Sequence, residues 1–193
     1  ERLDVEITFQ PIDWAMKETE LASGNIDMIW NGYTITEERK EKVLFSEPYL
    51  SNSQIIVTMA DSDIETKADL AGKVVATQQG SAAFDAIIAD ETGIAAEFDG
   101  GTPILYPTFN DVFNDLESGR SDAIVVDEVL GRYTMKLKGE EKFAVLTDNF
   151  GDEEYGVGLR KEDVALKEAI DATMNDMHED GTYDEIYAKW FAE

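Results

Sequence analysis

The chain of 193 residues has no cysteine and only one histidine. It can therefore form no disulfide, no thiolate nucleophile and no cysteine-ligated zinc site, and the absence of cysteine leaves its compartment open. Basic residues are also scarce, with 16 Lys and Arg against 42 Asp and Glu and a net charge of −26. This charge argues against binding to nucleic acid or to an anionic membrane surface. We expect no metal ion and no cofactor.

Long apolar runs are missing too, so the sequence contains no candidate for a bilayer-spanning helix and no signal peptide. Hydrophobic residues make up 43% of the chain, which predicts an ordinary folded core despite the charge. Near the start, Val5, Ile7 and Phe9 alternate with polar residues and predict a strand. Because nothing precedes this strand, we expect the chain to begin inside a longer protein.

The stretch from Asn31 to Arg39 follows an apolar run, Ile26–Trp30, that predicts a strand buried on both faces of a parallel sheet. Thr36 is a candidate N-cap of a short helix, with Glu37 and Glu38 in its first turn and Arg39 one residue on. An arginine at a helix start is suited to binding a carboxylate through two parallel hydrogen bonds. The alternative is an arginine that pairs with one of many nearby surface acids, and this stretch alone does not decide between them.

The remaining sequence alternates strands and helices, which predicts an α/β fold. A polar stretch at residues 61–66 indicates a boundary before a second such unit, and residues 151–154 interrupt the last strand pattern. The expected strands are residues 54–58, 73–77, 104–106, 122–126, 143–146 and 155–159, and the expected helices are residues 14–23, 82–91, 109–116, 127–138, 163–179 and one from 182.

One pattern occurs twice at an offset of 95 residues. Leu21-x-Ser-Gly-x-x-Asp-x-Ile29 recurs as Leu116-x-Ser-Gly-x-x-Asp-x-Ile124, and in both copies a helix ends at Ser-Gly before an apolar run. The pattern favours two similar α/β lobes over one continuous sheet, although Leu-x-Ser-Gly is also a common way for a helix to end.

If the repeat is real, Arg39 of one lobe and Asp127 of the other lie at the carboxyl ends of parallel strands, where open α/β sheets bind ligands. Two such edges that face each other would form a cleft. A cation on one wall and an anion on the other match the two ionised ends of a small α-amino acid.

The motifs Gly-x-Thr-Ile-Thr-x-x-Arg at residues 32–39 and Phe-Ser-x-Pro-Tyr at 45–49 are similar to those of the extracytoplasmic amino-acid-binding proteins of ABC importers. Gln-Gly-Ser at 79–81, the run that ends at Asp127 and Tyr-Gly-Val-Gly-Leu-Arg-Lys from Tyr155 match as well. The resemblance to this family, solute-binding protein family 3, covers nearly the whole chain. It implies a type II periplasmic-binding-protein fold, with two α/β lobes joined by a two-strand hinge.

Carried over residue by residue, the resemblance implies that Arg39 binds the ligand carboxylate with help from the Thr34 N–H, Ser81 and the Ala82 N–H. Asp127, the Gly32 carbonyl and the Thr34 hydroxyl would hold the ammonium. It places an aromatic ring, Trp14, against the ligand side chain. The side-chain pocket would be completed by Gln78, Asn31 and Trp30.

The resemblance also implies lobe boundaries, with residues 1–54 and 153–193 in lobe I and residues 55–152 in lobe II. Members of the family begin with a strand, a ligand-contacting loop and most of a first helix that would precede Glu1, so lobe I is expected to be N-terminally incomplete. We expect a monomer unless a second chain completes this lobe, and the sequence leaves open whether these residues alone bind ligand.

The implied function is binding of a polar L-amino acid outside the cytoplasm, in the periplasm or on a Gram-positive cell surface, and its delivery to a membrane permease. Glutamine, a basic amino acid and cystine all remain open as the ligand. One alternative is the ligand-sensing domain of a receptor. Another is a dehydratase-like enzyme, which the sequence supports little because the only histidine, His178, falls in an amphipathic helix.

Overall fold

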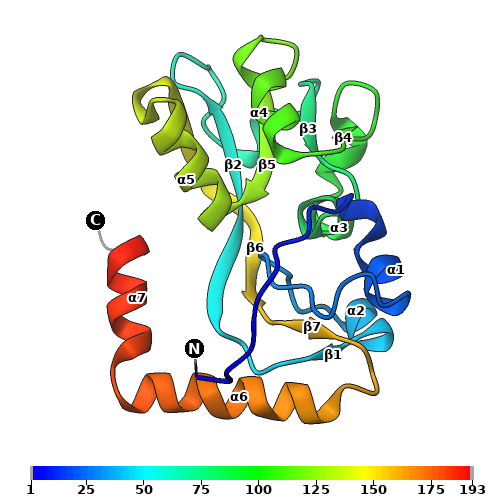
Figure 1. Cartoon of the computed structure of the whole chain (residues 1–193). Coiled ribbons are helices and arrows are strands. Elements are labelled where there is room, and N and C mark those ends of the chain that lie inside the picture. Colours follow the sequence, from blue (N-terminus) through cyan, green and yellow to red (C-terminus); the bar gives the residue numbers. More distant parts are fainter. Residues whose placement is uncertain (1, 192–193) are drawn as a thin grey trace. The chain divides into compact units, whose positions relative to one another are not determined.

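The structure is a computed structural model that describes residues 2–191, and it divides into two compact units (Figure 1). Unit 1 comprises residues 2–12, Lys17–Leu50 and 154–191, and unit 2 comprises Asp13–Met16 and Ser51–Glu153. Apart from the Asp13–Met16 segment, the chain crosses between units within strands β2 and β6. The predicted α/β fold class is confirmed.

Unit 1 is built around a short antiparallel pair of strands and a long helix. Its elements are α1 (Lys17–Ala22), α2 (Glu37–Lys42), β1 (Leu44–Phe45), β7 (Gly158–Leu159), α6 (Val164–Glu179) and α7 (Thr182–Phe191). Strand β1 pairs with β7, so that Leu44 lies opposite Leu159. As the amphipathic pattern predicts, Ile170 of α6 packs on Val157 and Leu159, with Leu166 and Met174 beside it. In Figure 1 α6 leads directly into α7.

Unit 2 contains a five-stranded mixed sheet in the order β4-β3-β5-β2-β6. Strand β3 is parallel to β4 and to β5, whereas β2 is antiparallel to β5. The elements are η1 (Trp14–Met16), β2 (Leu50–Met59), η2 (Lys67–Leu70), β3 (Val75–Gln78), α3 (Ala82–Ala89), η3 (Ile94–Glu97), β4 (Ile104–Tyr106), α4 (Phe109–Glu117), β5 (Ala123–Asp127), α5 (Glu128–Lys138), η4 (Glu140–Lys142) and β6 (Phe143–Tyr155).

Alternate residues of the central strands form two cores, one on each face of this sheet. Ile56 and Val125 pack with α3, η2 and η3 on one face. Ile55 and Ile124 pack with α4 and α5 on the other face. Because both faces are covered, β5 is buried along its whole length, which explains why its sequence is continuously apolar up to Asp127.

Two predicted strands of unit 1 are wrong. Residues 2–12 contain no strand, and Val5, Ile7 and Phe9 are exposed. In the run Ile26–Trp30 only Ile29 forms a bridge, to Gly158, and Trp30 is 48% exposed. An alternating or apolar pattern produces a strand only where a neighbouring strand accepts its backbone hydrogen bonds. Among the described residues the first segment pairs with no strand, and the second has only the single bridge at Ile29.

Strand β6 also differs from the prediction, because it continues through residues 151–154 without interruption. Gly151 has a φ of +116°, a conformation that glycine adopts without steric cost, so the strand passes through a sequence that suggests a break. The repeated Ser-Gly helix ends are confirmed, with φ values of +75° at Gly24 and +70° at Gly119. A strand of the sheet follows only the second of them.

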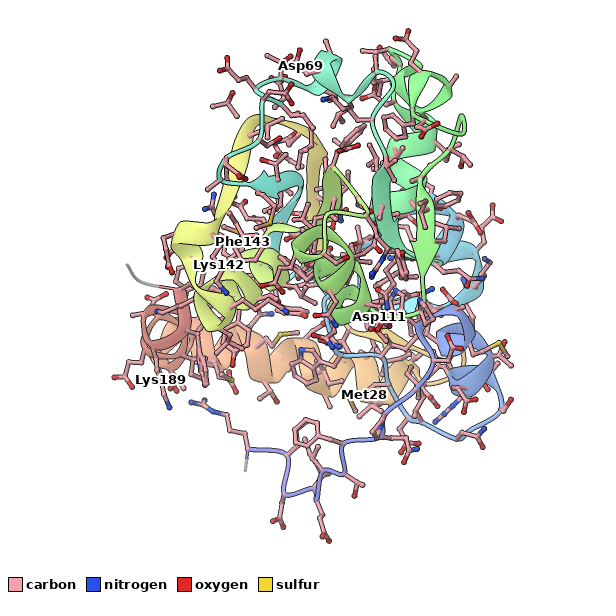
Figure 2. All side chains as sticks on the ribbon, turned by 90° about the horizontal axis from the view of Figure 1, so that it is seen from above. Met28, Asp69, Asp111, Lys142, Phe143 and Lys189 are labelled. Carbon is pink, nitrogen blue, oxygen red and sulfur yellow. The ribbon has the colours of Figure 1, made fainter. Side chains whose placement is uncertain are left out.

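Part of the large acidic surface has a local role at helix starts. Asp69 and Asp111, labelled in Figure 2, accept hydrogen bonds from Thr66 Oγ1 (2.8 Å) and Thr108 Oγ1 (2.6 Å). The hydrogen bonds from Thr66 lower the pKa of Asp69 below its ordinary value. Within residues 2–191, no helix is both long enough and apolar enough to cross a bilayer.

The core around α4 gives a test of this packing. Phe113 is fully buried and lies edge-to-face against Phe143, with ring centroids 5.7 Å apart. Phe113→Ala should lower the free energy of unfolding by about 3–5 kcal/mol, because a cavity replaces the ring. Urea denaturation measures the change, and Leu137→Ala at a 69% exposed position of α5 is the control, expected within about 0.5 kcal/mol of the parent protein. If Phe113→Ala lowered the free energy of unfolding as little as Leu137→Ala, the result would contradict the described core.

Candidate functional site

In unit 1 the predicted stretch places a buried guanidinium against its own backbone. Thr36 caps α2 as predicted, because its Oγ1 accepts the Arg39 backbone N–H at 3.1 Å. The Arg39 side chain is 5% exposed, and its Nη1 donates to the Thr34 carbonyl at 3.0 Å. Its Cζ lies 4.8 Å from the centroid of the Tyr33 ring. A buried charge is costly unless such partners surround it, and these contacts hold the Arg39 guanidinium in place within unit 1.

The other residues of unit 1 that were predicted to form the site precede Arg39 in the same segment. Thr34 is buried and forms an antiparallel bridge with Tyr155. Gly32 has a φ of +56°, and a Cβ there would lie 3.4 Å from the Tyr155 ring, so a side chain at this position would be strained. Burial raises the pKa of Tyr49 to about 12, and that ring lies 6.1 Å from Trp30. Asn31 is exposed.

In unit 2 Asp127 belongs to a cluster of two carboxylates and two amides. Asp127 Oδ1 accepts hydrogen bonds from Asn52 Nδ2 at 3.1 Å and from Gln54 Nε2 at 2.9 Å. The same two nitrogens donate to Glu153 Oε1 at 2.7 and 2.8 Å. The antiparallel register places Gln54 directly opposite Asp127, so the pairing of β2 with β5 builds the cluster. Neutral amides solvate the carboxylates without cancelling their charge.

Asp127 lies at the N-cap position of α5, as predicted, but its side chain makes no capping hydrogen bond. Asn52 supplies an acceptor instead, because its Oδ1 accepts the Val129 backbone N–H at 3.3 Å. Asn52 therefore caps the helix through its oxygen and holds Asp127 through its nitrogen. The Asp127 carboxylate is directed to the cluster rather than to the helix.

Three further predicted residues lie in or at the ends of the loop between β3 and α3. Ser81 caps α3 through the Phe84 N–H at 3.2 Å, and its hydroxyl donates to the Gln78 carbonyl at 2.7 Å. Gln78 Nε2 donates to the Pro107 carbonyl at 2.9 Å. Ala82 is the first residue of α3, so its N–H has no acceptor within the helix.

Trp14 begins η1 in the Asp13–Met16 segment of unit 2, where its side chain is half-buried. Asp13 Oδ1 accepts the Ala15 N–H at 2.9 Å, in agreement with the prediction that Asp13 lies at a helix start.

Several predicted site residues are therefore brought together within their own units, namely Arg39 with Thr34 and Gln78 with Ser81. The sequence interpretation missed Tyr33, Asn52, Gln54 and Glu153. The sequence does contain a signal for the two amides. Asn52 and Gln54 are two residues apart just before an apolar run, and this spacing places both side chains on one face of β2. Across residues 2–191 there is no group of three or more potential metal-ligating side chains.

A family comparison places the chain among known proteins. The sequence profile of the bacterial extracellular solute-binding proteins, family 3, matches residues 1–193. The chain belongs to this family. The predicted resemblance is confirmed, and the family consists of proteins described as binding solutes outside the bacterial cell.

Individual relatives agree with this assignment. The L-cystine-binding protein TcyJ of Escherichia coli (strain K12) is 33% identical over 191 residues, which cover 98% of this chain and 69% of TcyJ. The chain is also similar to an ABC uptake transporter substrate-binding protein from Streptococcus pneumoniae with bound histidine. That structure has a TM-score of 0.93 and 37% identity, and the match covers 98% of this chain and 77% of the other.

A third structure, an ancestral arginine-binding protein bound to glutamine, has a TM-score of 0.89 and 37% identity over all of this chain and 83% of that one. The names or bound ligands of the three relatives point to different amino acids, namely cystine, histidine and glutamine. The fold and family are therefore shared, whereas the ligand varies within the group.

The double role of Asn52 is testable. Asn52→Ala should lower the free energy of unfolding by about 1–3 kcal/mol, because it removes a helix cap and a hydrogen-bond donor to two carboxylates. Thermal unfolding followed by circular dichroism measures the loss. Asn110→Ala at an exposed position of α4 serves as the comparison and should change stability by at most about 0.5 kcal/mol. Equal effects of the two substitutions would rule out the capping role.

Proposed function

We propose that the protein binds a free L-α-amino acid and delivers it to the membrane permease of an ABC importer. The observation that carries the proposal is a pair of opposite buried charges, one in each unit. Unit 1 holds the guanidinium of Arg39, and unit 2 holds the carboxylate of Asp127. An α-amino acid at neutral pH carries one group that complements each, and buried partners make charge-assisted hydrogen bonds strong.

In this proposal Arg39 binds the ligand carboxylate, with the Thr34 N–H, Ser81 and the Ala82 N–H as further donors. Asp127 binds the ammonium, with the Gly32 carbonyl and the Thr34 hydroxyl as further acceptors. The burial of Arg39 and Asp127 supports these roles, because a desolvated ionic partner discriminates strongly against ligands that lack either charge.

The ligand side chain is assigned to Trp14, Gln78, Asn31 and Trp30, which supply aromatic faces and amide groups. Such a set suits a polar side chain packed against an aromatic ring. The relatives named above bind cystine, histidine and glutamine according to their names and structures. L-Cystine, L-histidine, L-glutamine and L-arginine are therefore the ligands to examine first.

The proposal gives the protein no catalytic step. Family membership points to solute binding, and the one histidine, His178, is exposed on α6 with its ring 3.9 Å from that of Tyr183. We place the protein outside the cytoplasm, either in a periplasm or at a Gram-positive cell surface.

Calorimetric titration with the common amino acids, beginning with these four, tests the proposal. At least one should bind, and Arg39→Ala should weaken that binding by on the order of 2–5 kcal/mol, because a buried ion pair with the carboxylate is lost. Arg39→Lys should recover only part of the affinity, since an ammonium cannot form the two parallel hydrogen bonds of a guanidinium.

Arg132→Ala is the matched control, because Arg132 is an exposed arginine of α5 that pairs with Glu128. The Arg132→Ala variant should bind the amino acid with the affinity of the parent protein. Absence of binding by all of the common amino acids would refute the proposed function, and unchanged affinity in Arg39→Ala would remove Arg39 from the site.

A further inference from the structure

Tyr33, which lies within the stretch Asn31–Arg39, is the largest fully buried side chain among the described residues. Its ring lies under the Arg39 guanidinium at 4.8 Å, within the range of an attractive cation–π contact. Arg39 also donates to the Thr34 carbonyl. A carbonyl fixes one nitrogen of the guanidinium, whereas an aromatic face fixes the plane in which all of its N–H groups lie.

Three contacts hold the Tyr33 ring in place. Its hydroxyl donates to Glu18 Oε1 at 2.9 Å, and its ring stacks on Phe45 at a centroid distance of 5.0 Å with an interplanar angle of 27°. At Gly158 an added Cβ would lie only 2.6 Å from Tyr33 Cε1, so the ring packs directly on this backbone. Tyr33 therefore has little room to shift or tilt.

The anchor of the hydroxyl is itself an ion pair on α1. Lys17 Nζ lies 3.4 Å from Glu18 Oε1, and Lys17 is buried. Burial, together with Glu18, raises the pKa of Tyr33 well above its ordinary value, so the phenol remains a neutral donor at physiological pH. Donation to a carboxylate also leaves the ring more electron-rich, which favours a cation on its face.

We propose that Tyr33 positions Arg39 for carboxylate recognition, with Glu18 and Lys17 as the anchor of the tyrosine. This inference rests on the proposed role of Arg39 in binding the ligand carboxylate. A guanidinium that is already oriented loses less conformational entropy on binding, so Tyr33 contributes affinity without contacting the ligand.

The first test needs no ligand. In the NMR spectrum of the full chain, the side-chain N–H resonances of Arg39 are assigned by their disappearance in Arg39→Lys. They should be shifted upfield by the Tyr33 ring current in the parent protein and in Tyr33→Phe, and should lose that shift in Tyr33→Leu. Resonances that are identical in the parent protein and in Tyr33→Leu would overturn the proposal.

The second test separates positioning from general stability by using pairs of ligands that differ in the carboxylate. The pairs are L-arginine with agmatine, L-histidine with histamine, L-glutamine with 4-aminobutanamide and L-cystine with cystamine. The pair used is one whose amino acid binds the parent protein. Tyr33→Leu should lower the affinity for the amino acid by about 3- to 30-fold and the affinity for the amine by less than about twofold. In an Arg39→Ala background the same substitution should have no further effect on the amino acid.

Ile170→Ala is the control for destabilisation, because Ile170 is buried in unit 1 within the core of Val157 and Leu159. Its affinities for both ligands should match those of the parent protein. Tyr33→Phe, which keeps the ring and is expected to fold, should retain most of the affinity for the amino acid.

If Tyr33→Leu weakened binding of the amino acid and of the amine equally, the positioning role would be overturned. Failure of every amino acid to bind the parent protein would instead refute the proposed function, and the NMR comparison would still decide whether Tyr33 orients Arg39.

Discussion

Burial of the Arg39 guanidinium is the constraint on which the arrangement of residues 33–39 in unit 1 depends. At 5% exposure the cation has lost nearly all contact with water, so the surrounding residues must replace that solvation. Residues close to it in sequence do so: the Thr34 carbonyl accepts a hydrogen bond, the Tyr33 ring lies under the guanidinium, and Thr36 fixes the backbone. The buried cation is thus held rigidly, as recognition of a small anionic group requires.

Unit 2 buries the opposite charge by different means. Asp127 and Glu153 share the amide nitrogens of Asn52 and Gln54, which are neutral donors and leave the negative charge of the cluster in place. Because Asn52 also caps α5, the helix start does not consume the Asp127 carboxylate. Solvation by dipoles rather than by cations is the arrangement that allows a carboxylate to bind a positively charged ligand group.

Local sequence signals predicted much of this arrangement. The Thr36 cap, the Ser-Gly helix ends and the position of Asp127 at the start of α5 depend only on neighbouring residues. The amides near Asp127 were missed because the antiparallel register brings Gln54 to it across 73 residues of chain. The strands predicted at Val5–Phe9 and Ile26–Trp30 failed for a related reason, since a strand depends on a partner that the local pattern does not specify. Tyr33 was overlooked because a buried aromatic side chain resembles an ordinary core residue.

A crystal structure of the protein grown with its tightest-binding amino acid would test the central claim most directly, because it locates both charged ends of the ligand. We expect the ligand carboxylate within hydrogen-bonding distance of the Arg39 guanidinium and the ligand ammonium within hydrogen-bonding distance of an Asp127 carboxylate oxygen. A ligand whose carboxylate and ammonium lie on other residues would contradict the assignment of these two buried charges to amino-acid recognition.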